Sequence, residues 1–433
     1  MVSRWKLAVL FCFAMGGLAL LSQPVQKPAP ARTLVRAGRL LDVKTGKLAD
    51  AQTIVVVGET IQSIAPTAEV QAQAGDTVVD LSGLTVLPGL IDVHTHLTYT
   101  PDFDPYHELT STDAKEAING VVNARTTLLA GFTSVRNVGA DGYTDVDLRD
   151  AINSGQIAGP HMLVSGPALG ITGGHCDDNL LPLKYHLVGE GVADGIAEVQ
   201  HKVRQNVKYG ADLIKICATG GVLSKGDDPQ AAQYTLEEMK AIVADAHRLG
   251  RKVAAHAHGA QGILWAAEAG VDSIEHGSYI NDEAIAEMKK DGTYLAPTLY
   301  LEDWQIEKGS LPPFYHQKMV DVSAVAKSNI KHAMQAGVKI AMGTDAAVYP
   351  HGLNAHELDV YVNQLDMAPL AALQTATVNA ADLMGWSAKT GTLEAGKWAD
   401  IIAVDKNPLD DVRVLEDVKF VMKAGVVYKN EAK

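Results

Sequence analysis

The chain has 433 residues, of which 47% are hydrophobic and 20% are charged. This composition excludes a disordered, a collagen-like or a disulfide-framework protein, and the length fits either two or three small domains or a large α/β barrel with an additional domain. The 37 Lys and Arg residues and 51 Asp and Glu residues give a formal net charge of −14. That charge argues against binding to the phosphate backbone of nucleic acids.

The N-terminus has the proportions of a signal peptide. Arg4 and Lys6 precede an apolar run that ends at Leu21, and polar and Pro-rich residues follow. The run is shorter than the ~20 residues of a membrane span. We therefore predict that residues 1–22 are a cleaved signal peptide rather than an uncleaved anchor, and that residues 23–31 are a flexible linker. We therefore expect the protein to be periplasmic or secreted, with no stable membrane insertion after cleavage of the signal peptide.

Two cysteines, Cys176 and Cys217, remain after the predicted cleavage. One disulfide between them is one interpretation. Cys217 lies in an apolar, strand-like run, however, and this position is typical of a buried free thiol. The sequence therefore favours the free thiol.

Three segments with different patterns follow the linker. Residues 32–83 contain short β-type runs broken by turns. Residues 84–388 alternate apolar strands with amphipathic helical stretches such as 235–249 and 320–336, a pattern typical of βαβ units around a parallel sheet. The β-type runs return in residues 389–433. We expect the first and third segments to pair in one small β-sandwich domain.

Eight strands can be placed in the middle segment, and eight βα units make a closed (β/α)8 TIM barrel. The predicted fold class is thus α/β, with the β-sandwich formed by both chain ends beside the barrel. The predicted strands are Gly89–His94, Thr133–Asn137, Met162–Ser165, Leu213–Ala218, Val253–Ala257, Ser273–His276, Tyr294–Pro297 and Lys339–Gly343.

The first predicted barrel strand leads into His94 and His96. Side chains two residues apart in a strand point to the same face, and barrel enzymes place their active sites at the C-terminal ends of the strands. Two imidazoles that converge there indicate a divalent metal ion. By itself the pair fits two half-exposed histidines without a ligand equally well.

Polar residues also end four other predicted strands. Lys215 lies in the fourth strand, His256 and His258 end the fifth, His276 the sixth and Asp345 the eighth. Taken singly, a Lys usually extends its charge to solvent and a strand-end Asp usually caps the next helix. Convergence from five strands favours a metal site instead. A Lys buried there has a lowered pKa and can add carbon dioxide, and the resulting carbamate can bridge two cations.

These residues resemble the amidohydrolase superfamily over the whole chain. The family has His-x-His, Lys, His, His and Asp on strands one, four, five, six and eight, and residues 391–401 are similar to its return from barrel to sandwich. The spacings of 41 residues from Lys215 to His256 and 20 residues from His256 to His276 resemble the imidazolonepropionase-related group of Xaa-Pro dipeptidases, metal-dependent carboxypeptidases and ochratoxin-hydrolysing amidohydrolases. Asn137 stands where these relatives often have Asp, and we interpret it as a residue that supports the ligands.

The resemblance implies a site for two divalent metal ions, expected to be zinc. In that pattern His94, His96 and Asp345 hold one metal, His256 and His276 the other, and N6-carboxylated Lys215 both. Asp345 is also the expected catalytic acid and base, which takes a proton from the attacking water and passes it to the leaving amine. His258 lies on the same face as His256 and is expected to contact the substrate.

Two further residues are candidates for substrate binding. His175 lies in the loop 170–176, whose glycines would allow a close approach to a ligand. In the relatives the loop after strand four contributes a Tyr, which makes Tyr234 the candidate contact for a substrate carboxylate. The alternative is that Tyr234 packs in front of a helix capped by Thr235.

We expect a small-molecule amide or peptide substrate that is cleaved at the amide bond to a C-terminal amino acid. Dipeptides, N-acyl amino acids and ochratoxin-type amides fit this description. The alternatives are a cyclic-amide hydrolase similar to imidazolonepropionase, a deaminase, and a non-catalytic binding protein of the cell envelope. The bridging Lys argues against the common mononuclear deaminase, and the full set of six metal positions argues against a silent binding protein. A homo-oligomer is compatible with the sequence.

Overall fold

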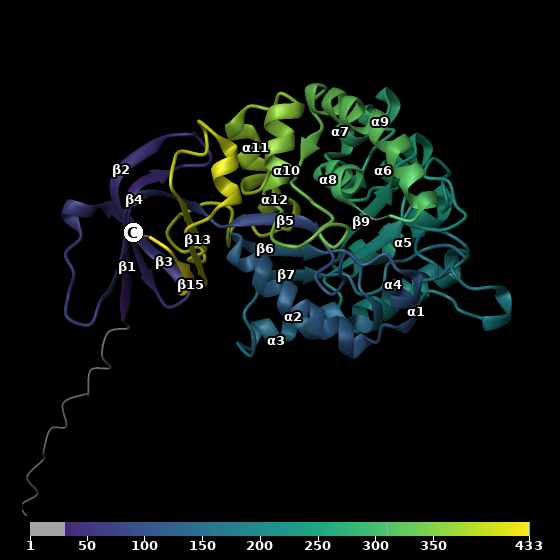
Figure 1. Cartoon of the computed structure of the whole chain (residues 1–433), viewed down its shortest axis with the longest axis horizontal. Helices are drawn as coiled ribbons and strands as arrows, with labels where there is room; N and C mark the ends of the chain where they lie inside the picture. The colour runs from purple at the N-terminus through teal and green to yellow at the C-terminus, as the bar shows by residue number, and fades with distance from the viewer. Residues whose placement is uncertain (1–30, 310, 433) are drawn as a thin grey trace, which may run out of the picture. The chain divides into compact units, whose positions relative to one another are not determined.

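The computed structural model describes residues 31–309 and 311–432 (Figure 1). The predicted signal peptide, and the predicted linker except for its last residue, lie outside these ranges. Within them, no helix is long and apolar enough to cross a membrane. Residues 31–433 form one compact unit.

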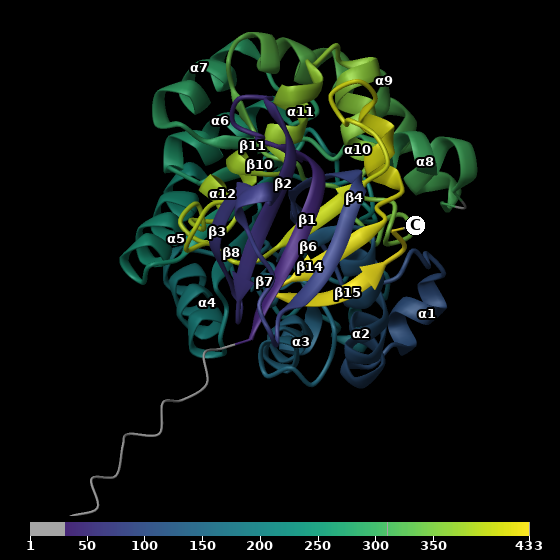
Figure 2. The same cartoon turned by 90° about the vertical axis from the view of Figure 1, so that its left-hand side faces the viewer.

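Both ends of the described chain join one seven-stranded sheet, visible as purple and yellow strands in Figure 2. Its order is β15-β14-β13-β4-β1-β2-β3, with β4 parallel to β1 and antiparallel to β13. The predicted pairing of the two ends is therefore present. The strands are β1 (Arg32–Leu41), β2 (Leu48–Val57), β3 (Thr60–Pro66), β4 (Thr77–Pro88), β13 (Ile401–Val404), β14 (Phe420–Lys423) and β15 (Val426–Asn430).

The predicted β-sandwich differs from this arrangement, because the seven strands form a single sheet. The Ile61 amide donates to the Lys397 carbonyl at 2.9 Å, and the Ala399 amide donates to the Glu59 carbonyl at 2.8 Å. These bonds connect β3 to the segment before β13, so the sheet bends back on itself. One apolar cluster contains residues from both chain ends, including Val35, Ile54, Val86, Ile401 and Phe420. A bent sheet around one core has the same alternating pattern as two facing sheets.

All eight strands predicted between residues 84 and 388 are present, although the last is shorter than predicted. They form a three-stranded parallel sheet in the order β5-β6-β7 and a five-stranded parallel sheet in the order β12-β11-β10-β9-β8. The strands are β5 (Leu90–Thr95), β6 (Phe132–Asn137), β7 (His161–Val164), β8 (Leu213–Cys217), β9 (Lys252–Ala257), β10 (Ser273–His276), β11 (Tyr294–Ala296) and β12 (Lys339–Ile340).

Backbone hydrogen bonds connect the two parallel sheets at both of their edges. On one side the Val93 amide donates to the Met342 carbonyl at 2.9 Å, which joins β5 to the segment after β12. On the other side the Asp212 amide donates to the Val164 carbonyl at 2.7 Å, which joins β7 to the start of β8. The α/β alternation is confirmed, and the strand ends from both sheets come together.

The helices lie around the parallel strands (Figure 2). Thr235 caps α5 in a capping box with Glu238, as the sequence predicted for this helix start. Helix α9 begins seven residues before the predicted 320. The α-helices are α1 (Pro105–Thr110), α2 (Asp113–Leu129), α3 (Thr144–Asn153), α4 (Ile196–Lys208), α5 (Leu236–Arg248), α6 (Ala260–Ala269), α7 (Asp282–Asp291), α8 (Tyr300–Lys308), α9 (Pro313–Gln335), α10 (His356–Asp359), α11 (Pro369–Thr375) and α12 (Val378–Leu383).

Candidate active site

The predicted metal ligands gather at the C-terminal ends of the parallel strands. His94, Lys215, His256 and His276 are buried on β5, β8, β9 and β10. Asp345 follows β12, and its amide donates to the His94 carbonyl at 2.8 Å. Asp345 and His276 have positive φ angles of 58° and 70°. Non-glycine residues rarely adopt this conformation, and such strain concentrates at functional sites.

Distances between side-chain atoms place the histidines and Asp345 around one small space, and Lys215 lines the cavity beside them. Asp345 Oδ1 lies 3.4 Å from His94 Nε2 and 3.3 Å from His96 Nε2. Potential ligand atoms of His94, His276 and Asp345 lie within 4.8 Å of one another, and so do those of His256, His258 and His276. His276 belongs to both groups, so the two groups are adjacent.

The second ring nitrogen of each histidine has a hydrogen-bond partner that fixes the orientation of the ring. Four rings use Nδ1 in this way and leave Nε2 for a ligand. In His256 the two nitrogens have the opposite roles: Nε2 lies 3.2 Å from the Gly220 carbonyl oxygen, and Nδ1 is left for a ligand. Such outer partners are usual for metal-binding histidines. The Nδ1 contacts are His94 to Glu275 at 2.8 Å, His96 to the Gly139 carbonyl at 3.1 Å, His258 to Ser278 at 2.8 Å and His276 to Thr298 at 2.7 Å.

Glu275 is a functional residue that the sequence analysis missed. It is fully buried, and its second oxygen accepts from Arg136 Nη2 at 2.7 Å. Burial alone would raise the pKa of Glu275, but Arg136 and the His94 hydrogen bond lower it below the ordinary range. The carboxylate is therefore charged and holds His94 in one orientation. The available signal was a glutamate immediately before His276, in a strand that is otherwise too apolar for an unpaired charge.

Burial and neighbouring charges put His256, His276 and Asp345 in the protonation states that metal ligands need. Burial lowers the pKa of Lys215 to about 8 and those of His256 and His276 well below the ordinary range. Burial opposes ionisation of Asp345, but His94 and His96 hold the pKa of that carboxyl well below its usual value. Neutral imidazoles and an anionic carboxylate fit a divalent metal ion.

A cavity of about 800 Å³ opens beside the ligand cluster. Its walls contain ligands such as His96 and Lys215, the apolar residues Phe103 and Leu223, and the exposed Lys225. A smaller cavity of about 50 Å³ lies next to His256 and His258, and its other lining residues are both apolar, such as Leu301 and Met319, and charged, such as Glu302 and Asp345. The larger cavity, which lies next to convergent polar groups, has room for a small organic molecule.

The wall on the His96 side is acidic. Tyr99 stacks on His96 and donates a hydrogen bond to Asp141 at 3.0 Å. Burial and neighbouring carboxylates raise the pKa of Asp141 to about 6 and that of Glu116 to about 7. These groups disfavour a second anion, so this side of the cavity is a poor place for a carboxylate.

His175 lies in the cavity wall, as the sequence predicted. Its ring stacks on that of His256 with centroids 4.1 Å apart, and its Nδ1 lies 2.8 Å from Ser224 Oγ. Burial lowers the pKa of His175 to about 4, so the imidazole is neutral near pH 7. His258 lines the smaller cavity. Both residues can therefore reach a molecule bound beside the metal ligands.

Tyr234 is placed differently from the expectation. Its side chain is fully buried, its hydroxyl donates to the Ala193 carbonyl at 3.2 Å, and it does not line either cavity. The proposed contact with a substrate carboxylate is therefore not supported. The alternative, packing in front of the helix capped by Thr235, describes this residue.

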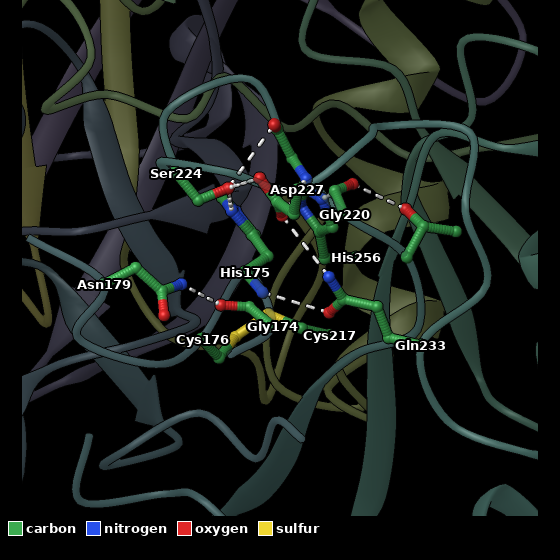
Figure 3. Close-up of a disulfide and its surroundings, with 12 residues drawn as sticks. Gly174, His175, Cys176, Asn179, Cys217, Gly220, Ser224, Asp227, Gln233 and His256 are labelled. Atoms are coloured by element: carbon green, nitrogen blue, oxygen red, sulfur yellow. Dashed lines mark hydrogen bonds between the residues drawn. A yellow bond between two sulfur atoms is a disulfide. The ribbon is translucent and has the colours of Figure 1, made fainter. Parts of the chain in front are cut away.

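The prediction for the two cysteines was wrong, because Cys176 and Cys217 form a disulfide with Cα atoms 6.0 Å apart (Figure 3). Cys217 is buried at the end of β8, as expected. The Cys217 amide donates to the Leu169 carbonyl, and this pairing brings the loop with Cys176 to the strand. Periodicity along the sequence carries no information about that tertiary contact.

Asn137 makes hydrogen bonds that are compatible with the supporting role expected from the sequence. Its Oδ1 accepts from the Leu97 amide at 2.6 Å, and its Nδ2 donates to the Gly139 carbonyl at 3.0 Å. The same carbonyl contacts His96 Nδ1. Asn137 thus fixes the segment that orients a ligand.

Comparisons with known proteins give a family match and several relatives. Residues 85–428 match the model of the amidohydrolase family. The chain is 38% identical over 371 residues to ochratoxinase from Aspergillus niger, with 79% of this chain and 75% of that protein covered. It is 24% identical over 353 residues to imidazolonepropionase from Symbiobacterium thermophilum, with 75% and 76% covered. The crystal structure of a Xaa-Pro dipeptidase with bound methionine in its active site superimposes with a TM-score of 0.88 and 38% identity, over 92% of this chain and 100% of that one.

Proposed function

The chain belongs to the amidohydrolase family, and from this premise we propose that it is a metal-dependent hydrolase of the amide bond to a C-terminal amino acid. Dipeptides and N-acyl amino acids are the proposed substrates, and ochratoxin-type amides fit the same description. The main support is the buried cluster of His, Lys and Asp side chains at the cavity. Names of the relatives support it too, since one is an ochratoxinase and another is a dipeptidase with an amino acid in its active site. We propose that the two parallel sheets, joined at both edges, form the predicted (β/α)8 barrel.

The proposal places two divalent ions, zinc in type, among six residues. His94, His96 and Asp345 would hold one, His256 and His276 would hold the other, and carboxylated Lys215 would contact both. Lys215 is 4% exposed, and its lowered pKa leaves a fraction of neutral amine near pH 7. That amine adds to carbon dioxide and loses one proton, which gives a carbamate with two oxygens. When bound, the metal ions activate water and polarise the scissile carbonyl.

Asp345 is the proposed proton carrier. Its backbone is held by the His94 carbonyl, and its Oδ1 lies near both His94 and His96. It accepts a proton from the attacking water and passes this proton to the leaving nitrogen, which departs as a neutral amine. Because its pKa is held low, Asp345 is ionised and ready to accept a proton at neutral pH.

The carboxylate of the leaving amino acid is proposed to lie on the His175 side of the cavity. The exposed Lys225 lines this side of the cavity, and its ammonium group can donate hydrogen bonds to a carboxylate. The acidic wall around Asp141 and Glu116 lies on the His96 side and disfavours a carboxylate. Hydrogen bonds to a charged group contribute roughly 1.5–3 kcal/mol each.

The opening of a cyclic amide is the second candidate function. It is favoured by the similarity to imidazolonepropionase and needs the same metal ligands, but it does not need a free carboxylate on a leaving group. A binding protein without catalysis is the third alternative.

A library assay separates these functions. The metal-loaded protein is incubated with dipeptides and N-acyl amino acids, each with a free or an amidated C-terminus, and released amino acid is measured. We expect turnover of the free acids and a roughly ten- to hundredfold lower kcat/KM for the amidated forms. Equal rates on substrates with a free and with an amidated C-terminus would favour the opening of a cyclic amide as the function. Binding without turnover of any amide would favour a binding protein.

Export to the periplasm or beyond the cell remains part of the proposal. The Cys176–Cys217 disulfide supports it, since stable disulfides are typical of oxidising compartments. Intact-mass analysis of exported protein tests it: we expect loss of about the first 22 residues, and an exported chain that still contains Cys12 contradicts cleavage.

A further inference from the structure

The wall of the cavity next to His175 is a long connection with little regular structure. Residues 165–195 link β7 to α4, and their helical content is the short 3-10 turn Leu183–Tyr185. Cys176, Asn179 and Leu180 from this connection line the cavity. Loops of this length inside a compact domain are commonly functional, and they are held in place by their own contacts.

The disulfide joins this loop to the strand that carries the proposed bridging ligand. Cys176 follows His175 directly, and Cys217 lies two residues after Lys215 at the end of β8. Both cysteines line the large cavity. Figure 3 shows His175 and His256 beside the bridge. The covalent bond therefore connects the loop wall to the proposed metal-ligand layer. This layer comprises the side chains of His94, His96, Lys215, His256, His276 and Asp345.

The position of His175 depends on close contacts that tolerate little movement. A Cβ atom at Gly221 would lie 2.2 Å from the His175 ring, and a Cβ atom at Gly170 would lie 2.7 Å from Cys176 Cβ. The His175 ring and Cys176 fit in these positions only because residues 221 and 170 are glycines.

The polar contacts of His175 come from other loop residues. Its amide donates to Gln233 Oε1 at 3.0 Å, and its ring contacts Ser224. Ser224 donates to Asp227 at 2.7 Å, and Asp227 pairs with Lys318 at 2.8 Å. Ser224, Asp227 and Gln233 all lie in the connection between β8 and α5. The disulfide, in contrast, attaches the residue next to His175 to a buried strand.

We propose that the Cys176–Cys217 disulfide positions His175 against the metal-ligand layer and so sets the affinity for substrate. This inference rests on the proposed amide hydrolysis only where kinetics are measured. Its structural part is tested without a substrate. Without the bond, Cys176 is no longer restricted to the Cα separation of 6.0 Å, and the loop gains conformational freedom. Small misplacements of a substrate-positioning group lower kcat/KM by as much as about a hundredfold.

Chemical reduction of the disulfide removes the same bond without a substitution. A water-soluble phosphine attacks one sulfur of the bridge, water supplies the oxygen, and the products are two cysteine thiols and one phosphine oxide. Two electrons pass from phosphorus to the two sulfurs, and water supplies both protons. A phosphine is preferable to a dithiol here because dithiols bind zinc.

The kinetic test uses the full chain with metals bound. Cys176→Ala, Cys217→Ala and the double variant are compared with wild type before and after phosphine treatment. We expect KM to rise about tenfold in all three variants and in reduced wild type, with kcat changed less than threefold and metal content unchanged. Equal effects of the single and double variants identify the bond, rather than either side chain, as the cause. Wild-type KM in the double variant would overturn the proposal.

A second comparison separates positioning of His175 from general loosening. His175→Ala is combined with Cys176→Ala, and kcat/KM is measured for all four forms. If the bond acts through His175, removing it from the His175→Ala protein changes kcat/KM less than twofold. The same tenfold loss in both backgrounds would contradict action through His175.

Hydrogen exchange gives a readout that does not need a substrate. Amides of residues 170–191 should exchange faster in reduced wild type and in Cys176→Ala, while amides of β8 to β10 keep their protection. Unchanged exchange in residues 170–191 would overturn the proposal even if activity falls. If the oxidised protein hydrolyses none of the library amides, the proposed function fails, and the exchange data still decide whether the disulfide holds the loop.

Discussion

The catalytic end of the protein contains two regions that are built differently. The proposed metal-ligand layer has most of its side chains on buried strand ends, and each histidine ring is oriented by a partner such as Glu275 or Thr298. The wall around His175 is made of long connections held by hydrogen bonds between loop residues and by one disulfide. Strand ends give a rigid arrangement suited to one chemistry, whereas loops can change their shape without disturbing the strands. We therefore assign chemistry to the first region and substrate selection to the second.

Replacing Asp345 with Asn tests the first region with the largest expected effect. The amide cannot accept the proton of the attacking water, so kcat should fall by about a hundredfold or more. The overall fold and at least one metal should be retained. A variant with more than about a tenth of wild-type turnover would require another group as the proton carrier.

Replacing Lys215 with Ala tests the bridging position in the same layer. Most of the activity should be lost, because the proposed carbamate oxygens are removed from between the two metals. Short carboxylic acids such as formate or acetate should restore part of the activity, since their carboxylate can occupy the vacated space. Absence of any rescue, with both metals still bound, would contradict a carbamate at Lys215.

Replacing Glu275 with Gln tests whether the outer partners of the ligands matter. Loss of the charged hydrogen bond to His94 Nδ1 should weaken metal binding by about 10–100-fold, as measured by competition with a chelator. Glu287→Gln is the matched control, because Glu287 pairs with Lys290 on α7, away from the ligands. Equal metal affinity of the Glu275→Gln and Glu287→Gln variants would show that Glu275 does not support metal binding.

Replacing Tyr234 with Phe should have the smallest effect on activity. The change removes one hydrogen bond to the Ala193 carbonyl, so the free energy of unfolding should fall by about 1 kcal/mol. The ratio of kcat/KM between free and amidated substrates should stay within about twofold of wild type. A large change in this ratio would return Tyr234 to the substrate-binding residues and place the specificity wall elsewhere.

The two regions also differ in how far the sequence predicts them. All eight strands follow from short apolar runs, and five of these runs lead into His, Lys or Asp, whose directions are fixed by strand geometry. Pairing of the two chain ends was predicted too, but a bent single sheet and a sandwich have the same alternation. Backbone bonds such as Ile61 to Lys397 distinguish them, and periodicity does not encode such bonds.

The loop wall was predicted less well for a physical reason. Tyr234 and His175 both lie in connections between a strand and a helix, and only tertiary packing decides that one is buried and the other lines the cavity. The disulfide likewise depends on the distance between a loop and a strand that are far apart in sequence. Glu275 was missed because its partners Arg136 and His94 lie on other strands.

Metal titration of the apoprotein tests the central claim most directly. Chelated protein is supplied with increasing zinc in the presence of bicarbonate, and bound metal and release of amino acid from one library substrate are measured together. The account predicts that activity rises until two ions are bound per chain and then stays constant. Full activity at one ion per chain, or two bound ions without hydrolysis of any amide, would contradict it.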